Sequence, residues 1–196
     1  MHSASLTMYA RRSMSVLPPT SRIAEPSQLS SAIADLFQAH GDRMLNAAHR
    51  VTGSLEDAED VLQSVFVRLV QHPDNLSAVN GQDAGAYLHR AAVNAALDLL
   101  RARARRPAET VADLPGPAGA PIDASLLDNE LADRLRAGLA GLHPRAAEMV
   151  ALRYLEELSN QEVAARTGSS ESTVAVTLYR ARQTLRERMS PKEGRS

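Results

Sequence analysis

The chain has 196 residues, enough for one or two domains, and its formal net charge is −1 at pH 7. It contains no cysteine, which excludes disulfides, thiolate metal sites and cysteine nucleophiles. Apolar residues make up 44% of the chain but aromatic residues only 3%, so the cores must be built mostly from Leu, Val and Ala. Because the sequence also has few strand-like alternating runs, this composition favours an all-α protein.

The first segment, residues 1–28, is rich in Ser, Pro and Arg and shows no sustained periodicity. We therefore expect a disordered N-terminal extension, in which Met8 and Met14 are alternative candidate start residues. No apolar run there is long enough for a signal-peptide core or a membrane span, so we expect no membrane insertion.

Residues 29–106 show helical periodicity and predict a compact N-terminal domain of four helices. Two helices are expected on either side of a break near Gly41, and Gly53 should end the second. Ser54 with Asp57 is a capping-box pattern that starts the third. The apolar residues expected on the core faces of these three helices are Leu29, Ile33, Leu36, Phe37, Met44, Leu45, Ala48, Val51, Val61, Leu62, Val65, Phe66 and Leu69.

After a polar loop over residues 72–85, the fourth helix should run from about residue 84 to 105, before Pro107. Its expected interior residues are Leu88, Ala91, Ala92, Ala95, Leu99 and Ala102, and its expected exposed residues are His89, Arg90, Asn94, Asp98 and Arg101. Arginine can pair with phosphate or guanine and asparagine can read adenine, so the exposed face is able to contact DNA. A merely solvated basic face is the alternative.

The acidic first turn of the third helix holds four carboxylates, those of Glu56, Asp57, Glu59 and Asp60. Their interaction with the helix dipole, worth about 0.3–1 kcal/mol each, is enough to explain their presence. A metal site is not expected, because no histidine falls at a helical ligand spacing beside them.

Residues 107–125 contain four prolines and two glycines, which predicts a linker. The segment carries Glu109, Asp113 and Asp123 but no Lys or Arg. A plain spacer is the simpler interpretation of this segment.

Residues 126–189 predict a second four-helix domain, followed by a tail over 190–196. Leucines at helical spacing indicate a helix that ends before Pro144, and Pro144 suits the first turn of the next helix. The domain ends in a pattern typical of a helix-turn-helix, which covers Leu158 to Arg182.

Within this pattern, Ser159 and Glu162 form a capping box, and Gly168 suits the left-handed residue that ends a helix. The second helix should begin near Glu171 and turn Val174, Leu178, Ala181 and Leu185 inward. The exposed N-terminal half would then reach the major groove of DNA. A plain helical hairpin in a bundle is the alternative.

Three segments in this order resemble the extracytoplasmic-function sigma factors, the small two-domain members of the bacterial sigma-70 family. They are DAEDVLQSVFVRL (57–69), YLHRAAVNAALDLLRARARR (87–106) and LHPRAAEMVALRYLEELSNQEVAARTGSSESTVAVTLYRARQTLRE (142–187). The resemblance implies a cytoplasmic promoter-specificity subunit that binds core RNA polymerase, recognises the minus-ten and minus-thirty-five promoter elements and promotes DNA opening. It also implies an anti-sigma factor as partner, and neither a catalytic site nor a cofactor nor a metal.

The resemblance implies roles for particular residues. Contacts to the clamp helices of the polymerase large subunit would come from Asp57, Glu59, Asp60, Gln63 and Phe66, and the C-terminal domain would meet the flap. Minus-ten DNA would be contacted by Asn75, Asn80, Tyr87, Arg90, Asn94 and Arg101, with an unstacked base captured by the 72–85 loop. Minus-thirty-five DNA would be contacted by Ser170, Ser172, Thr173, Ala175, Val176, Thr177, Arg180 and Arg182. The acidic linker would imitate nascent RNA inside the polymerase.

The chain departs from the family pattern at three places. Ser64 stands where relatives often have Glu, and Tyr87 stands where many have Trp. Relatives commonly place basic and polar residues directly after the Thr-Val pair, whereas Ala175, Val176 and Thr177 follow it here. Phosphate contacts by basic side chains would then carry more of the affinity for DNA.

Two other classes of protein compete with this interpretation. A free-standing regulator of the response-regulator output type has a similar helix-turn-helix, but its receiver would show strands alternating with helices and a phosphoacceptor aspartate. A small helical hydrolase or metal enzyme could use His40, His49 and the acidic turn, but no nucleophile elbow, paired-His motif or Gly-rich phosphate loop supports it.

Overall fold

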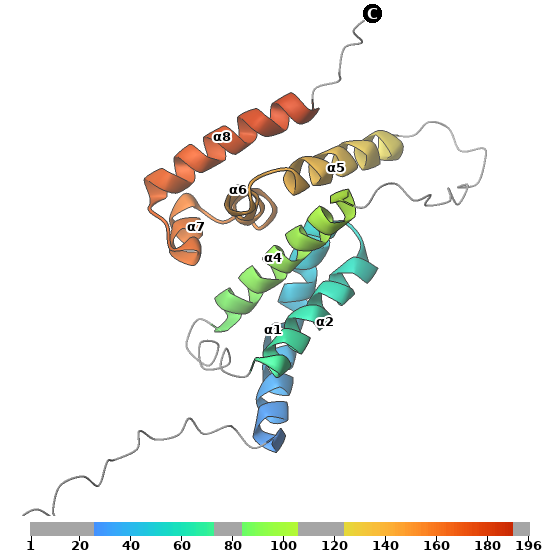
Figure 1. Ribbon diagram of the computed structural model, residues 1–196, viewed down its shortest axis with the longest axis vertical. Coiled ribbons are helices and arrows are strands. Elements are labelled where there is room, and N and C mark those ends of the chain that lie inside the picture. The colour runs from blue at the N-terminus through green and yellow to red at the C-terminus, as the bar shows by residue number, and fades with distance from the viewer. Residues whose placement is uncertain (1–25, 73–83, 106–123, 190–196) are drawn as a thin grey trace, which may run out of the picture.

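The computed structural model describes residues 26–72, 84–105 and 124–189, and the regular elements within these ranges are all helices, as predicted (Figure 1). The N-terminal unit consists of α1 (Pro26–Thr52), α2 (Leu55–Gln71) and α4 (Ala84–Arg105). The C-terminal unit consists of α5 (Ala124–Ala140), α6 (Pro144–Val150), the π-helical turn η1 (Ala151–Leu155), α7 (Asn160–Thr167) and α8 (Glu171–Met189).

Some predictions concern residues outside the described ranges. These are the extension up to residue 25, most of the polar loop with Asn75 and Asn80, the linker acids and the tail. Helix α1 begins at Pro26, inside the predicted extension, where proline suits the first turn because its missing N–H has no helical partner there.

Helix α1 is one continuous helix, so the predicted break near Gly41 is wrong. A glycine inside a helix costs about 1 kcal/mol relative to alanine. The parts of α1 on either side of Gly41 pack Ile33 and Leu36 against the core and bury Met44 and Val51 within it. Because burying one such side chain contributes about 1.5–3 kcal/mol, the continuous helix is favoured in spite of the glycine.

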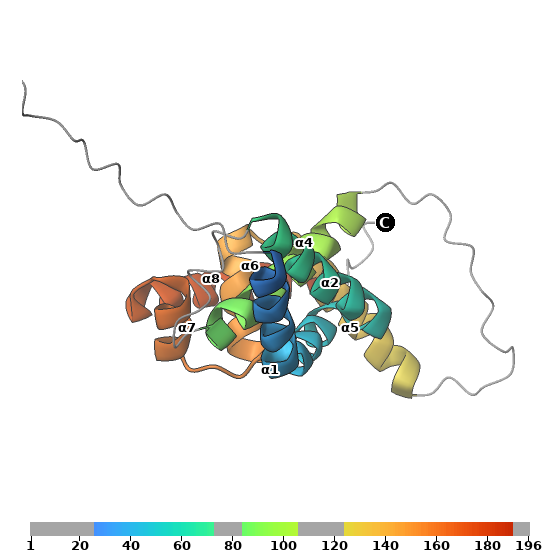
Figure 2. The same ribbon diagram turned by 90° about the horizontal axis from the view of Figure 1, so that it is seen from below.

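Helices α1 and α2 lie side by side and are joined at a tight corner (Figures 1 and 2). Gly53 has φ +74°, the left-handed conformation predicted for the end of a helix. The Ser54 hydroxyl accepts a hydrogen bond from the Asp57 amide at 3.3 Å, so the Ser54 half of the predicted capping box is confirmed. The Asp57 carboxylate instead binds Arg103 of α4.

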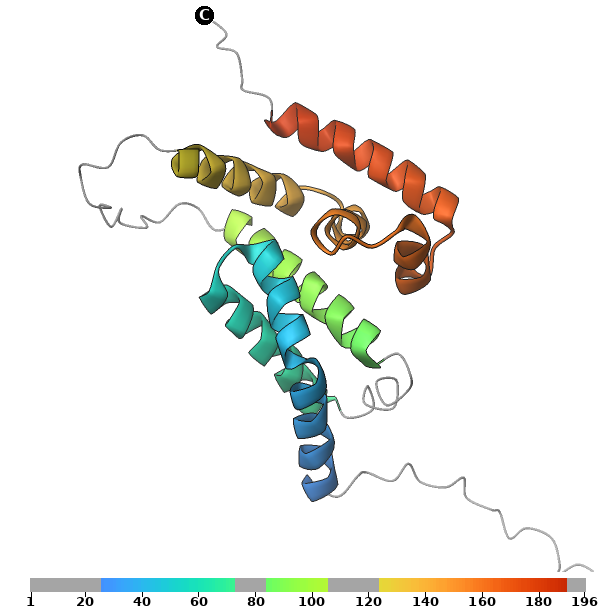
Figure 3. The same cartoon turned by 180° about the vertical axis from the view of Figure 1, so that it is seen from behind.

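Helix α4 lies between α1 and α2 on one side and α5, α6 and α7 on the other (Figures 1 and 3). Its predicted single apolar stripe is therefore only partly correct. Buried as predicted are Leu88, Ala92 and Ala95, and only half-buried are Ala91, Leu99 and Ala102. Because neighbours cover α4 from two sides, burial extends to residues outside that stripe, namely Val93, Ala96, Leu97 and Leu100.

The helix-turn-helix is formed by α7 and α8, and its local geometry confirms the predicted signals. The Ser159 hydroxyl accepts from the Glu162 amide at 3.2 Å, and the Glu162 carboxylate accepts from the Ser159 amide at 2.8 Å. Gly168 is left-handed, with φ +62°, and ends α7. The side chains buried beneath α8 are Val174, Leu178, Ala181 and Leu185.

The capping box predicts the effect of Ser159→Ala. The substitution removes the hydroxyl that satisfies the Glu162 amide, so we expect the free energy of unfolding to fall by about 0.5–2 kcal/mol at neutral pH. Chemical denaturation followed by circular dichroism measures this loss. Ser31→Ala, at an exposed position inside α1, is the matched control and should change stability by less than about 0.5 kcal/mol. Equal effects of the two substitutions would contradict a capping role.

Candidate nucleic-acid and protein interfaces

The acidic end of α2 divides into exposed and buried residues. Glu59, Asp60 and Gln63, which the sequence predicts to contact a protein partner, are exposed. The Asp57 side chain is only 6% exposed, and both of its carboxylate oxygens bind the guanidinium of Arg103. Asp57 therefore joins α2 to α4 within the unit, whereas the other three side chains are free to meet a partner surface.

Substituting Arg103 tests the internal role of Asp57. Arg103→Ala leaves a buried carboxylate without its charged donor, so we expect a loss of about 1–3 kcal/mol in the free energy of unfolding. Arg105→Ala, at an exposed position in the last turn of the same helix, is the matched control and should be near neutral. Adding Asp57→Asn to Arg103→Ala should recover part of the loss, and a double variant less stable than Arg103→Ala would contradict this account.

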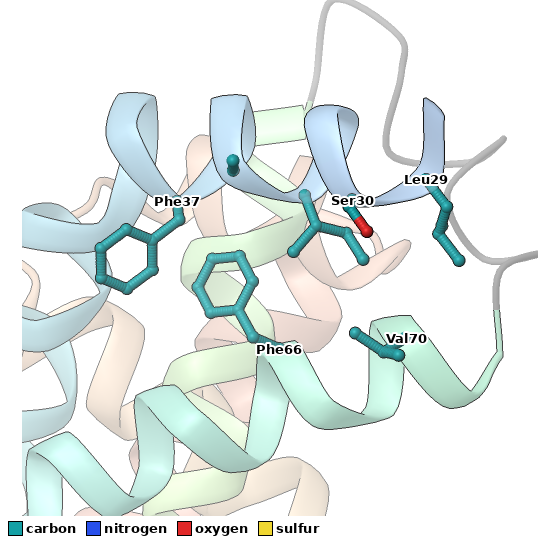
Figure 4. Close-up of a pocket in the computed structure, with 7 residues that line it drawn as sticks. Leu29, Ser30, Phe37, Phe66 and Val70 are labelled. Atoms are coloured by element: carbon teal, nitrogen blue, oxygen red, sulfur yellow. The ribbon is translucent and has the colours of Figure 1, made fainter. Parts of the chain in front are cut away.

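An apolar groove opens between α1 and α2, toward the C-terminal end of α2 (Figure 4). Phe66, which the sequence also predicts to contact a protein partner, is 9% exposed and packs edge-on against Phe37, with ring centroids 5.3 Å apart. Phe37 and Val70 at the groove are about half exposed, at 53% and 52%. The other residues lining the groove are Leu29, Ser30, Ile33 and Ala34.

The polar face of α4 is not the open surface that the sequence predicts. Arg90 Nε donates to Glu148 Oε1 of α6 at 2.5 Å, and Asn94 Nδ2 donates to the same oxygen at 3.0 Å. Arg101 is 14% exposed and donates to the exposed Asp98 at 2.7 Å. The C-terminal unit lies against this face and covers most of it.

His89 was expected on the same exposed face, but it is 1% exposed, so that expectation is wrong. Its Nε2 lies 2.6 Å from Glu156 Oε2, and its Nδ1 lies 3.1 Å from Arg166 Nη1. A guanidinium only donates, so Nδ1 accepts and Nε2 carries the proton given to Glu156. Arg50 of α1 also donates to Glu156 Oε2, at 3.4 Å.

Both glutamates at this junction stay ionised at neutral pH. Burial raises the pKa of Glu148, but the hydrogen bonds from Arg90 and Asn94, with the charges of Arg90 and Arg145, outweigh burial and hold that pKa below its usual value. Burial likewise raises the pKa of Glu156, and the His89 hydrogen bond and the nearby Arg50 reverse the shift.

The outer face of α8 presents the residues that the sequence predicts to touch DNA. Ser172, Thr173, Ala175, Val176, Arg180 and Arg182 are exposed, and Thr177 is half-buried. The Ser170 hydroxyl accepts from the Thr173 amide at 3.2 Å, so it caps the start of the helix. Small side chains thus lie exposed near the start of α8, with arginines further along.

Two residues at this surface were missed by the sequence prediction. Tyr179 is 58% exposed and lies three residues after Val176, on the same side of α8. An aromatic residue outside the apolar stripe was the available signal for it. Arg145 of α6 donates to the Thr167 carbonyl and to the Ser169 hydroxyl, which fixes the turn of the helix-turn-helix. No local pattern marks Arg145.

The described part of the chain holds no group of three or more His, Asp or Glu residues placed to bind a metal ion. Among the described helices, none has an apolar stretch of the length needed to span a bilayer.

Comparisons with known proteins match both units. Residues 36–106 match the family model of sigma-70 region 2, and residues 132–185 match that of sigma-70 region 4. The RNA polymerase sigma-E factor of Streptomyces avermitilis is 35% identical over 156 residues, which cover 78% of this chain and 82% of that protein. The ECF RNA polymerase sigma factor SigE of Mycolicibacterium smegmatis is 33% identical over 161 residues, covering 78% of this chain and 60% of SigE.

Among solved structures, that of CnrH in complex with the cytosolic domain of CnrY is similar, with a TM-score of 0.48 and 25% sequence identity. The match covers 82% of this chain and 92% of the compared chain.

Proposed function

We propose that this chain, which belongs to the extracytoplasmic-function sigma factors of the sigma-70 family, holds a promoter at two places while bound to core RNA polymerase. In this proposal the N-terminal unit binds the clamp helices of the polymerase large subunit and the minus-ten element. The C-terminal unit binds the flap and the minus-thirty-five element. The polymerase supplies the chemistry of RNA synthesis, and this chain supplies the choice of start site.

The observation that carries the proposal is the exposed outer face of α8, in a chain whose two units match sigma-70 regions 2 and 4. The second helix of a helix-turn-helix lies in the major groove, with its N-terminal residues at the base edges. Ala175 and Val176 suit thymine methyl groups, and Thr173 can hydrogen-bond to bases or phosphates. The exposed Tyr179 extends this contact surface by almost one turn.

The polymerase contact is assigned to the exposed side of α2. Glu59, Asp60 and Gln63 offer carboxylate and amide oxygens to a basic partner helix. The apolar groove beside Phe66 lies on the same side of the unit and exposes carbon atoms to a partner. An acidic end beside an apolar groove suits an amphipathic helix that carries arginines.

The minus-ten contact is assigned to α4 and the preceding loop. Tyr87 is 40% exposed and can stack on an unpaired base. Arg90, Asn94 and Arg101 supply the donors for phosphates and base edges. An anti-sigma factor and a cytoplasmic location follow from the same family assignment and belong to this proposal.

Holoenzyme assembly tests the proposal. The purified protein is mixed with core polymerase, separated by size exclusion, and footprinted on a promoter that requires it. We expect one complex that protects both promoter elements and makes the minus-ten region reactive toward a probe of unpaired thymines. Protection of duplex DNA by the protein alone, unchanged by core polymerase, would instead identify a free-standing regulator.

Substituting Arg180 separates phosphate contacts from base reading. Arg180→Ala should weaken binding at all promoters alike and reduce the slope of log affinity against log salt by about one. Holoenzyme affinity measured over a salt series gives this slope. Arg134→Ala, at an exposed position on α5, is the control and should leave the slope unchanged. A slope that Arg180→Ala does not alter would remove Arg180 from the phosphate contacts.

A further inference from the structure

The apolar groove between α1 and α2 lies beside the point where the chain enters α1 (Figure 4). Its first lining residue, Leu29, comes three positions after Pro26, the first residue of α1. From Leu29 to Phe37 the groove follows α1 for about 12 Å, at about 1.5 Å per helical residue. Phe37 and Val70 are about half exposed there, so apolar surface is left for a further segment to cover.

The α2 side of the groove continues into the acidic turn. One stripe of α2, at helical spacing, consists of Glu59, Gln63, Phe66 and Val70. Figure 4 shows Val70 opposite Leu29 and the start of α1, with Phe66 further along. A segment that entered the groove from the start of α1 would therefore pass the apolar residues first and the carboxylates second.

Residues 1–25 contain a short apolar segment that fits this groove. Met14 and Val16 alternate with serines, so an extended backbone would present both apolar side chains on one face, about 7 Å apart. Both side chains can therefore lie within the length of the groove. Pro18 and Pro19 follow closely and restrict the backbone, which lowers the entropy lost on docking.

The charges of this segment also match those beside the groove. Arg11 and Arg12 come just before the apolar pair. With that pair in the groove, a chain that arrives from α1 would bring both guanidinium groups toward the exposed carboxylates of Glu59 and Asp60. The order of apolar and charged side chains is thus the same in the segment as along α2.

The length of chain before α1 permits this arrangement. Val16 lies 10 positions before Pro26, and such a length of extended chain spans up to about 33 Å, enough to turn back over the start of α1. Leu6 and Met8 form a second alternating apolar pair, but the arginines follow that pair instead of preceding it. Of the two pairs, the one that contains Val16 therefore has its basic side chains on the side that faces the acidic turn.

We propose that residues 11–16 occupy the apolar groove of the same chain in the free protein, with Val16 beside Val70, Met14 beside Phe37 and the two arginines beside the acidic turn of α2. Because the proposed function assigns this side of α2 to the polymerase, the segment and the polymerase compete for it. The competition rests on that assignment, whereas the docking itself does not.

Disulfide trapping in the full chain tests the docking without polymerase. The sequence has no cysteine, so Val16→Cys with Val70→Cys gives one possible pair, and Met8→Cys with Val70→Cys is the matched control. A freely moving tether would favour the nearer position by only about two- to threefold, from the inverse three-halves power of its length. We expect the Val16→Cys pair to form the intramolecular disulfide about tenfold faster than the control in native buffer, and at nearly the same rate in concentrated urea.

The other outcomes of the trapping experiment contradict the docking. A ratio of rates no larger than the tether alone gives would overturn it. A disulfide-linked dimer in place of the intramolecular bond would identify a second copy of the chain as the occupant instead. Circular dichroism checks that each variant is folded. If Val70→Cys disturbs the fold, Ala34→Cys, at an exposed position of the same groove, replaces it with the same expected ratio.

Binding to core polymerase tests the competition. Met14→Ser with Val16→Ser should bind about threefold tighter or more, because the groove is then free in a larger fraction of molecules. Leu6→Ser with Met8→Ser removes an apolar pair of the same spacing and should bind like the unsubstituted protein. Equal affinities of the two variants in a titration with core polymerase would rule out competition. If the unsubstituted protein does not bind core polymerase, the proposed function fails, while the disulfide rates still decide the docking.

Discussion

Reversing the charges of Glu59 and Asp60 together, by Glu59→Arg with Asp60→Arg, is expected to lower promoter-dependent transcription by about 30-fold or more. The reason is that losing a central contact of an interface costs about 2 kcal/mol or more in binding free energy. Both side chains are exposed at the start of α2, so the fold does not depend on them. Like charges facing a basic partner helix would repel it as well as remove the attraction. Run-off transcription with a titration of core polymerase measures the effect.

The matched control carries the same charge change on the neighbouring helix. Asp35→Arg with Asp42→Arg alters two exposed acids of α1 and should leave transcription within about twofold, as surface substitutions outside an interface usually do. If added core polymerase restores the α2 variant to full activity, the defect is one of affinity, as expected. Equal transcription by the two double variants would remove the acidic turn from the polymerase interface.

Truncating Leu97 to alanine is expected to lower the free energy of unfolding by about 2–5 kcal/mol, because it removes three buried carbon atoms and leaves a cavity. Leu97 is fully buried in α4, the helix enclosed by both units. A domain of this size is stabilised by about 5–15 kcal/mol in total, so the loss is a large share. Urea denaturation followed by circular dichroism measures the shift.

Val67→Ala is the control for this truncation, because Val67 is 45% exposed on α2. It should change the free energy of unfolding by less than about 0.5 kcal/mol. A loss below about 1 kcal/mol for Leu97→Ala would mean that the enclosed position of α4 is wrong, since a fully buried leucine does not give so small an effect.

Local signals in the sequence predicted the parts of the fold that local interactions determine. The capping box of Ser159 and Glu162 and the left-handed Gly168 depend on residues at most a few positions apart. Their hydrogen bonds form whenever the chain turns there, whatever packs around them. The start of α8 and its buried stripe followed from the same short-range pattern.

The errors arose where distant residues decide the structure. Gly41 carries a local preference to break a helix, which burial along α1 outweighs. His89 and Arg90 look like exposed residues of α4, but the partners that cover them come from the C-terminal unit. Arg90 and Glu148 are 58 positions apart, and no periodicity within either helix relates them. The assignments of residues to DNA and polymerase contacts remain predictions, because they too depend on partners that no local pattern reveals.

Transcription by purified core polymerase on a library of genomic promoter fragments tests the central claim most directly. With this protein added, we expect new start sites whose upstream DNA shares two sequence elements at one constant spacing, and none of these starts with core polymerase alone. No initiation at any fragment, together with duplex binding by the protein alone, would contradict the account.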